Sequence, residues 1–345
     1  ITAKASTTTI SLEKMSPFIP YGIIAEGVAD FIKTNIKGGK YQLKEGSING
    51  RMSQITHMGE HENYNVLHVK VGVDEGIISY GKDVPVFSGI KGELEFRGKD
   101  MLLHNMYGKF GESPMTLEGR ITDYCVPGPS GYPFALTMTP GQKEVAWLLG
   151  MDVGSKFVFT GKTSLRMTGS GTTDNYKLDG HWDITDASYN YNDVFTKPPS
   201  QYNQLAFKSG FKSGEWQIEA FSFWLASLRM NATANYRVKD EHISYFAVES
   251  NLFQIEHLLS NLPQMSKYQP SGSMQFALTG CGMPKSIADL DLRGNIAFSG
   301  VSFRPIETFR AINVLKGSVS ISKNRLDTSL LTGRIGKSPV QGRVT

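Results

Sequence analysis

The stretch GKFGESPMTLEGRI (residues 108–121) recurs near the end of the chain as GRIGKSPVQGRV (residues 333–344). The likeness extends upstream, because KGELEF (residues 91–96) is echoed by KGSVSI (residues 316–321). Gly92 and Gly317 lie 225 residues apart, and the same offset holds without a gap to Pro114 and Pro339. Self-similarity at a fixed spacing is typical of a chain built from repeated structural units.

Apolar and polar residues alternate along this stretch and along most of the chain. Leu94 and Phe96 fall on one side of an extended segment, whereas Glu93 and Glu95 fall on the other. A period of two is typical of strands with one apolar and one solvated face. Short loops rich in Gly, Asn, Asp and Pro separate these segments, as hairpins require. The sequence therefore predicts a mainly β fold, an elongated and curled antiparallel sheet of repeated units with a few short amphipathic helices.

Three short segments depart from the alternation and are predicted to be amphipathic helices. They cover residues 26–39, 141–151 and 251–262. Phe31, Ala146 and His257 occupy equivalent places in them, at spacings of 115 and 111 residues. Two such spacings together come close to the offset of 225, so the chain is predicted to be one continuous repeat of three units, residues 18–133, 134–245 and 246–345.

Two of these features carry further expectations. The first helix is expected to cap one end of the apolar face of the sheet. The middle unit is the least regular copy, and its polar, Tyr-rich segment at residues 185–204 is predicted to be a flexible loop.

Composition excludes several classes of protein. Charged residues make up 20% of the chain and hydrophobic residues 40%, which fits neither a disordered tail nor a bundle of membrane helices. The net charge of +4 is spread along the chain, so we expect no nucleic-acid partner. The two cysteines, Cys125 and Cys281, exclude a disulfide scaffold and CxxC zinc sites, while a single bridge between them stays open.

No segment has the pattern of a catalytic or metal site. His57, Glu60, His61 and His68 lie close together in the sequence, but their spacing is not HExxH and the segment resembles a polar hairpin tip. Asp and Glu elsewhere alternate with apolar residues, which places them on a solvated face. We therefore predict a protein that is not an enzyme and needs no cofactor or metal.

A large one-sided sheet must cover its apolar face. Three short helices cannot cover roughly twenty strands spaced ~4.8 Å apart. The sheet can fold over into a closed core, close into a membrane barrel with lipid outside, or curl into a trough whose apolar lining holds something else. The alternating segments are expected to form strands shorter than the ~10 residues of membrane barrels, and helices are expected to interrupt them, which disfavours the barrel.

The trough alternative assigns a binding role to the residues on the apolar face. Phe, Leu, Ile and Met are adaptable, non-directional partners for acyl chains. The predicted lipid-binding residues are Leu94, Phe96, Met115, Leu117, Ile121, Leu165, Met167, Met274, Phe276, Leu278, Leu290, Leu292, Ile296, Phe298, Val319 and Ile321.

The motifs also support a family resemblance. The pattern G-K-[FI]-G-x-S-P followed by G-R-[IV], the KLDG and DLRG strands, and a short helix opening each unit resemble the AsmA-like proteins of the bacterial envelope. The stretch IPYGIIAEGVADFIKTNIKGGKYQLKEGSINGRM (residues 19–52) is similar to the repeat start in their YhdP/TamB branch. The resemblance runs from about residue 17 to the end of the chain.

This resemblance implies a fold and a function. The fold would be an incompletely closed sheet with a U-shaped section, an apolar groove inside and a polar exterior. The function would be to bind phospholipid acyl chains in the groove and act as a passive conduit between inner and outer membrane, in outer-membrane biogenesis. The implied partners are phospholipid or another acyl lipid, unknown envelope proteins, and the inner membrane through an anchor outside this segment.

The implied location is the periplasm or cell envelope. The chain begins and ends within an alternating pattern, so we expect it to be a fragment of a longer, membrane-anchored protein. The main alternative is a structural or adhesion-type envelope β protein that has a closed core and binds glycan or protein.

Overall fold

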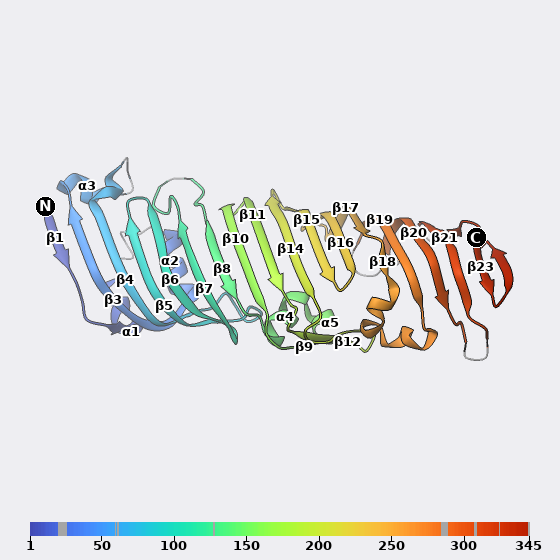
Figure 1. The fold of residues 1–345 in the computed structure, drawn as a ribbon. Helices are drawn as coiled ribbons and strands as arrows, with labels where there is room; N and C mark the ends of the chain where they lie inside the picture. Colours follow the sequence, from blue (N-terminus) through green and yellow to red (C-terminus); the bar gives the residue numbers. More distant parts are fainter. Residues whose placement is uncertain are drawn as a thin grey trace. The chain divides into compact units, whose positions relative to one another are not determined.

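The computed structural model describes residues 1–19, 26–58, 60, 62–126, 128–283, 289–306, 309–323 and 325–343. Within them the chain is mainly β, and 21 strands belong to one antiparallel sheet that is not closed on itself. This confirms the predicted fold class. Figure 1 shows the strands following one another in chain order, with a few short helices beside them. The chain divides into two compact units, described separately below: unit 1 is Ile1–Gly154 with Ser164–Tyr176, and unit 2 is Ser155–Thr163 with Lys177–Thr345.

Unit 1 is an antiparallel meander in which most strands pair with their neighbours in the chain. Its strands are β1 (Thr2–Ala5), β2 (Ile10–Ser11), β3 (Ile36–Asn49), β4 (Leu67–Ile78), β5 (Phe87–Arg97), β6 (Asp100–Phe110), β7 (Ser113–Ile121), β8 (Phe134–Met138) and β10 (Ser164–Thr172). Its helices are α1 (Leu12–Met15), η1 (Ser16–Phe18), α2 (Glu26–Asn35), α3 (Met52–Thr56), η2 (Asn63–Val66), α4 (Gln142–Leu149) and α5 (Met151–Gly154). Strands β3 to β8 pair in succession, and β10 pairs with β8.

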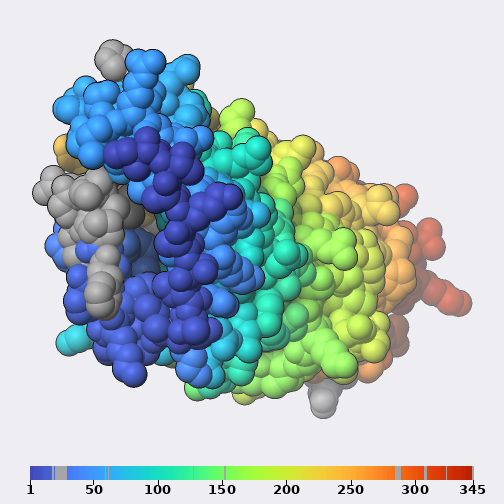
Figure 2. Space-filling view, turned by 90° about the vertical axis from the view of Figure 1, so that its left-hand side faces the viewer, coloured from blue at the N-terminus to red at the C-terminus, as the bar shows by residue number. Residues whose placement is uncertain are grey.

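The N-terminal strand lies along β3 at one end of unit 1. β1 pairs with the far end of β3, where Thr2 faces Asn49. The amide of Gly50 donates to the carbonyl of Ile1 at 3.0 Å. Figure 2 looks at this end and shows the first residues, in dark blue, lying beside the segment that follows β3, in lighter blue.

Unit 2 continues the same construction. Its strands are β14 (Asn203–Lys212), β15 (Glu215–Leu225), β16 (Leu228–Arg237), β17 (His242–Ser250), β18 (Phe253–Gln254), β19 (Ser271–Gly282), β20 (Leu290–Phe303), β21 (Ile312–Ser322), β22 (Arg325–Thr328), β23 (Leu331–Ile335) and β24 (Ser338–Gly342). β11 (Asn175–Asp183) spans the boundary between the units. Hairpin pairing runs from β14 to β17, then from β19 to β21, and on through β23 to β24.

The Tyr-rich segment of unit 2 is ordered, so the prediction of a flexible loop there was wrong. It forms β12 (Ser188–Tyr191) and β13 (Phe195–Lys197), which join β9 (Phe157–Thr160) in a three-stranded sheet. The rings of Phe157 and Tyr189 stack at 5.4 Å, and those of Tyr189 and Phe195 at 5.9 Å. Aromatic cross-strand pairs stabilise a short sheet that has no alternating apolar pattern.

The predicted helices have different outcomes. α2 and α4 lie within the first two predicted segments. The third segment begins with β18 and then forms the 3₁₀ helix η3 (Ile255–Asn261), followed by η4 (Pro263–Tyr268). The helix predicted for this segment is therefore present as a 3₁₀ helix, which begins four residues later than expected and ends before Pro263, a residue without a backbone donor. The division into three units stays a prediction.

β-bulges bend the sheet within each unit. In unit 1 the register shifts between Val73 and Gly76 on β4, between Ser88 and Lys91 on β5, and between Leu103 and Met106 on β6. In unit 2, β20 and β21 carry corresponding shifts. Bulges add local twist and bend the strand that carries them. Because they fall on successive strands, each unit's sheet bends along a line that crosses its strands.

The 225-residue repeat extends to the backbone. Gly92 has a φ of +151° and Gly317 a φ of +150°. Gly111 and Gly336 both have a φ of +62°. The bulge of β5 between Ser88 and Lys91 recurs in β21 between Asn313 and Lys316. Both copies thus form the same irregular hairpin.

Candidate functional site

The strand register of unit 1 gathers apolar side chains on one face. Directly opposed residues of an antiparallel pair point to the same side. Leu94 faces Leu103, and Phe96 faces Met101, which in turn faces Ile121. A further row joins strands β6, β7, β8 and β10 through Met106, Leu117, Leu136 and Met167. We call the side that these residues share the apolar face of unit 1.

Unit 2 has an equivalent apolar face. Phe276 faces Ile296, which faces Val319. One row crosses seven strands without interruption, through Phe207, Phe221, Ala232, Val248, Leu278, Gly294 and Ile321. The apolar face therefore runs from strand to strand across the unit.

The sixteen residues predicted from the sequence all lie on strands, and the register places those within each unit on one face. Met115 is buried, whereas the other fifteen are half-buried. Side chains in a closed core would be almost wholly inaccessible. The side chains of the apolar face therefore pack against the sheet and against one another, while their outer surface stays accessible.

The opposite face of unit 1 carries charge. Cross-strand ion pairs join Lys44 to Glu93 and Lys91 to Asp74, both at 2.8 Å. Glu95 lies 2.9 Å from Nε2 of His68 and 3.0 Å from Nε2 of His104. The hydrogen bond to His68 lowers the pKa of Glu95. Charged side chains are mostly found in contact with water, so these pairs mark the solvated side of the sheet.

Helical segments pack on parts of each apolar face. In unit 1, Leu12 and Met15 of α1 pack against a buried cluster of Tyr41, Val73, Ile90 and Met106. In unit 2, Leu258 of η3 forms a buried cluster with Leu225 and Phe253, against which Phe276 packs. These short segments leave the long rows of half-buried residues accessible. The expected capping role of α2 stays a prediction.

An aromatic recess interrupts the apolar face of unit 2. Phe207, Ser209, Trp216, Ile218, Phe221 and Tyr236 line a hollow of about 380 Å³ on strands β14 to β16. The register of β15 against β16 shifts between Ile218 and Phe221, so the recess lies at a bulge. Its volume lies within the range of small-molecule sites, which are mostly apolar.

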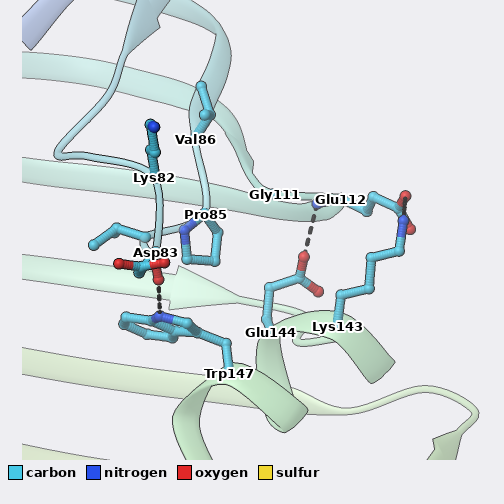
Figure 3. Close-up of a pocket in the computed structure, with 10 residues that line it drawn as sticks. Lys82, Asp83, Pro85, Val86, Gly111, Glu112, Lys143, Glu144 and Trp147 are labelled. Atoms are coloured by element: carbon cyan, nitrogen blue, oxygen red, sulfur yellow. Dashed lines mark hydrogen bonds and ion pairs between the residues drawn. The ribbon is translucent and has the colours of Figure 1, made fainter. Parts of the chain in front are cut away.

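A second hollow, of about 430 Å³, lies at the edge of unit 1 between the β4–β5 loop, the β6–β7 turn and α4 (Figure 3). Glu144 of α4 is 3% exposed and accepts hydrogen bonds from the amide of Glu112 at 2.8 Å and from Oγ of Ser113 at 2.5 Å. Nε1 of Trp147 donates to the carbonyl of Asp83 at 2.7 Å. These contacts fix α4 to the β6–β7 turn and to the β4–β5 loop.

Five aromatic rings lead from α2 to this hollow. They belong to Phe31, Tyr80, Phe87, Phe110 and Trp147, and successive ring centroids are 6.2, 6.0, 4.7 and 5.4 Å apart. The series forms an apolar border along the ends of β5 and β6.

The histidine-rich segment is only partly described, because His61 lies outside the described residues. His57 contacts the carbonyl of Ser53 at 2.9 Å, while His68 contacts Glu95 on the sheet. In the part of the chain that the structure describes, no three His, Cys, Asp or Glu side chains are arranged to hold a metal. Cys125 and Cys281 are both free thiols, and burial raises the pKa of Cys125.

The exposed area is large for the mass of the chain. The protein exposes 20541 Å². Two separate compact globules of half its 38.1 kDa would together expose only about 17,000 Å². The excess agrees with apolar faces that the protein itself does not cover.

Sequence reasoning missed part of each apolar face. Val71, Leu103, Leu136 and Phe221 belong to the same rows as predicted residues. Their strands carry bulges or short hairpins, and cross-strand register is not visible in periodicity alone. The 225-residue repeat was one available signal, because Gly92 and Gly317 mark the same register in both copies.

Comparisons with known proteins identify no family. No family model matches the chain, and neither a curated protein nor a solved structure matches it. Among the helices that the structure describes, none is long and apolar enough to cross a membrane.

Proposed function

We propose that the apolar faces bind the acyl chains of phospholipid and that the protein is a passive lipid conduit rather than an enzyme. The observation that supports this most strongly is a continuous apolar row, such as Phe207 to Ile321, whose larger side chains are half-buried instead of fully buried. Water contact with such a row is unfavourable, and an acyl chain that covers it gains about 0.8 kcal/mol per buried CH₂.

The chemistry of the two faces fits an amphiphile. Leu, Ile, Met and Phe provide non-directional contacts that tolerate sliding of a chain. The ionic groups of unit 1 lie on the opposite side of the sheet. The acyl chains of a bound lipid would lie on the apolar face, and its headgroup would remain in water beyond that face. Because neighbouring rows are alike, a bound chain can move from one to the next without losing all its contacts.

The cellular setting is part of the same proposal. The resemblance to AsmA-like proteins points to the periplasm, to phospholipid traffic from inner to outer membrane, and to an inner-membrane anchor outside residues 1–345. Envelope proteins at either end of the path would be the protein partners.

Matched pairs of variants test lipid binding. Leu117→Asp places a charge on the apolar face, whereas Thr116→Asp places the same charge on the opposite face of the same strand. Phe276→Asp and Gln275→Asp form the equivalent pair in unit 2. We would purify each variant under mild conditions and measure bound phospholipid by native mass spectrometry, with circular dichroism as a check on folding.

The expected result is bound lipid in the parent protein and in the Thr116 and Gln275 variants, and its loss in the Leu117 and Phe276 variants with the β spectrum retained. Lipid-free parent protein that stays so after incubation with phospholipid vesicles would contradict the proposal. Unfolding of only the Leu117 and Phe276 variants would instead favour a closed core.

A further inference from the structure

The two copies of the repeated hairpin differ in what lies against their tight turns. The first turn (residues 111–113) joins β6 to β7, and the second turn (residues 336–338) joins β23 to β24. Their sequences are GES and GKS, and the leading glycines, Gly111 and Gly336, share a φ of +62°. The backbones therefore present the same amide and hydroxyl donors.

The first turn is occupied by a carboxylate. Glu144 accepts from the amide of Glu112 (Figure 3) and from Oγ of Ser113. Its Oε2 also lies 3.3 Å from the amide of Gly141 at the start of α4. The amide of Gly141 donates to Ser113 Oγ at 2.9 Å. One glutamate in the first turn of a helix thus accepts hydrogen bonds from the donors of the β6–β7 turn and from an amide at the helix N-terminus. As a result Ser113 is only 2% exposed.

The second turn has the same donors, but no carboxylate of the described residues lies against them. Ser338 and Lys337 are exposed, and in the described residues no acidic side chain contacts either of them. Lys337 replaces Glu112, which removes one negative charge from the turn and adds a positive one.

Arg310 adds a second cation there. It occupies the place of Pro85, 225 residues earlier, and its Nη1 would lie 3.2 Å from a Cβ built on Gly336. A Cβ built on Gly111 would lie 2.2 Å from Oε1 of Glu144. A guanidinium therefore stands where it can bind an entering carboxylate through two N–H groups.

Apolar side chains beside the second turn are also uncovered. Phe309 takes the place of Val84, which is half-buried in the wall of the first hollow, yet Phe309 is 45% exposed. Ile306 is 60% exposed. In unit 1, α4 covers the equivalent region, with Val145 buried and Trp147 against Phe110 at 5.4 Å.

We propose that the second turn, together with Arg310 and Phe309, is a docking site for an amphipathic helix that carries a glutamate in its first turn, supplied by a polypeptide segment outside residues 1–345. The cationic turn complements the carboxylate, and Phe309 complements the apolar side of the helix. The α4 of a second copy does not fit, because its Glu144 is already engaged and buried. This site is independent of lipid binding on the apolar faces.

A labelled peptide with the sequence of residues 139–151 provides the first test. Titrated against the full chain and followed by fluorescence anisotropy, it should bind, and replacing its single glutamate by glutamine should weaken binding about tenfold, as expected for a hydrogen bond to a charged group. Arg310→Gln in the chain should weaken binding similarly. Lys316→Gln, which removes one exposed charge from β21, should have no effect. Equal binding by the glutamine peptide, or by the Arg310 variant, would overturn the proposal.

A second test attaches the helix covalently to the chain, because the isolated peptide can be too short to form a helix. Residues 121–154 are appended after Thr345, which continues the 225-residue offset and places α4 at the equivalent position. Amide exchange at Lys337 and Ser338 should slow by at least about tenfold, as expected for closing a protected site, and Arg310→Gln should reverse the effect. Exchange as fast as in the parent chain would refute the docking site.

Discussion

The ring of Phe207 lies directly over Gly180, because a Cβ built on Gly180 would be 2.3 Å from Cζ of Phe207. Both residues belong to unit 2, and Phe207 forms one wall of the aromatic recess. The absence of a side chain at Gly180 is therefore what allows the ring to lie flat on the sheet.

Replacing Gly180 by alanine should push Phe207 away from the sheet and into the recess. We expect a loss of about 1–3 kcal/mol in the free energy of unfolding, as for other overpacked sites, and reduced lipid capture by unit 2. Gly342→Ala is the control, since no atom lies within 4 Å of the added Cβ. Denaturant unfolding compares the two, and an equal stability of both variants would contradict this reading of the contact.

Val314 is strained in a way that its counterpart avoids. It has a φ of +54° and is 51% exposed, whereas Gly89 occupies the same bulge of the first copy with a φ of +58°. A β-branched residue costs about 1–2 kcal/mol in the left-handed region. Val314→Gly should therefore raise the free energy of unfolding by about 1 kcal/mol after the entropy of glycine is counted. The reverse change, Gly89→Val, should lower it, and thermal unfolding measures both.

Lys197 is a buried cation held by backbone carbonyls. It is 0% exposed and donates to the carbonyls of Ile184, Thr185 and Ala187 at 2.7, 2.5 and 2.5 Å. Lys197→Met should destabilise the protein by about 3 kcal/mol, because it leaves buried carbonyls without donors.

The control for that variant is Lys208→Met, which removes a largely exposed lysine 3.7 Å from Asp179 and should change stability by less than about 0.5 kcal/mol. Burial lowers the pKa of Lys197 to about 8. Its unfolded pKa is higher, so the unfolded chain holds the proton between the two values. Stability should consequently rise with pH from about 8 upward in the parent and not in the methionine variant.

Glu144 predicts a pH dependence of the same sign, but in the acid range. Burial alone would raise the pKa of its carboxyl, but hydrogen bonds from Ser113 and from the amides of Glu112 and Gly141 outweigh burial and lower it. A carboxyl whose pKa is lower in the folded state stabilises the protein at pH values above its unfolded pKa. This stabilisation is lost as the pH falls through the folded pKa. Glu144→Gln should cost about 1–3 kcal/mol at pH 7. The difference from the parent should shrink toward pH 3, as measured by denaturant unfolding at each pH.

The exposed ion pair of Lys143 with Glu112 provides the comparison for Glu144. Both side chains are about 70% exposed, with Nζ 2.6 Å from the carboxylate. Glu112→Gln should therefore change stability by less than about 1 kcal/mol at any pH. A larger acid effect there than at Glu144 would show that the turn is stabilised mainly by surface charge.

The alternation of Leu94 with Glu93, and the offset between Gly92 and Gly317, sufficed to predict an antiparallel sheet with one apolar face and a repeated hairpin. These features depend on residues close together in the sequence, so the alternation of apolar and polar residues and the repeat reveal them. The three-stranded sheet around Lys197 was not predictable in this way, because it joins β9 to strands almost thirty residues later through aromatic stacking. The 3₁₀ geometry of η3 and the bulge at Val314 depend on single residues, which leave no periodic signal.

The same limits apply to the candidate site. Residues such as Phe276 and Ile296 could be assigned to a face from their own strands. The aromatic recess could not, because Trp216 and Phe207 line one hollow at a point where the register of β15 shifts. Glu144 was also missed, since its role depends on a turn thirty-one residues earlier in the chain, at Ser113.

The succession of hairpins has a consequence for biosynthesis. From β3 to β8, each strand pairs with the one made just before it. The chain closes only short loops at each step, and their entropic cost is small. A nascent chain leaving the ribosome can therefore add one strand at a time to an edge already formed, without waiting for distant sequence. Each completed hairpin then serves as the template for the next.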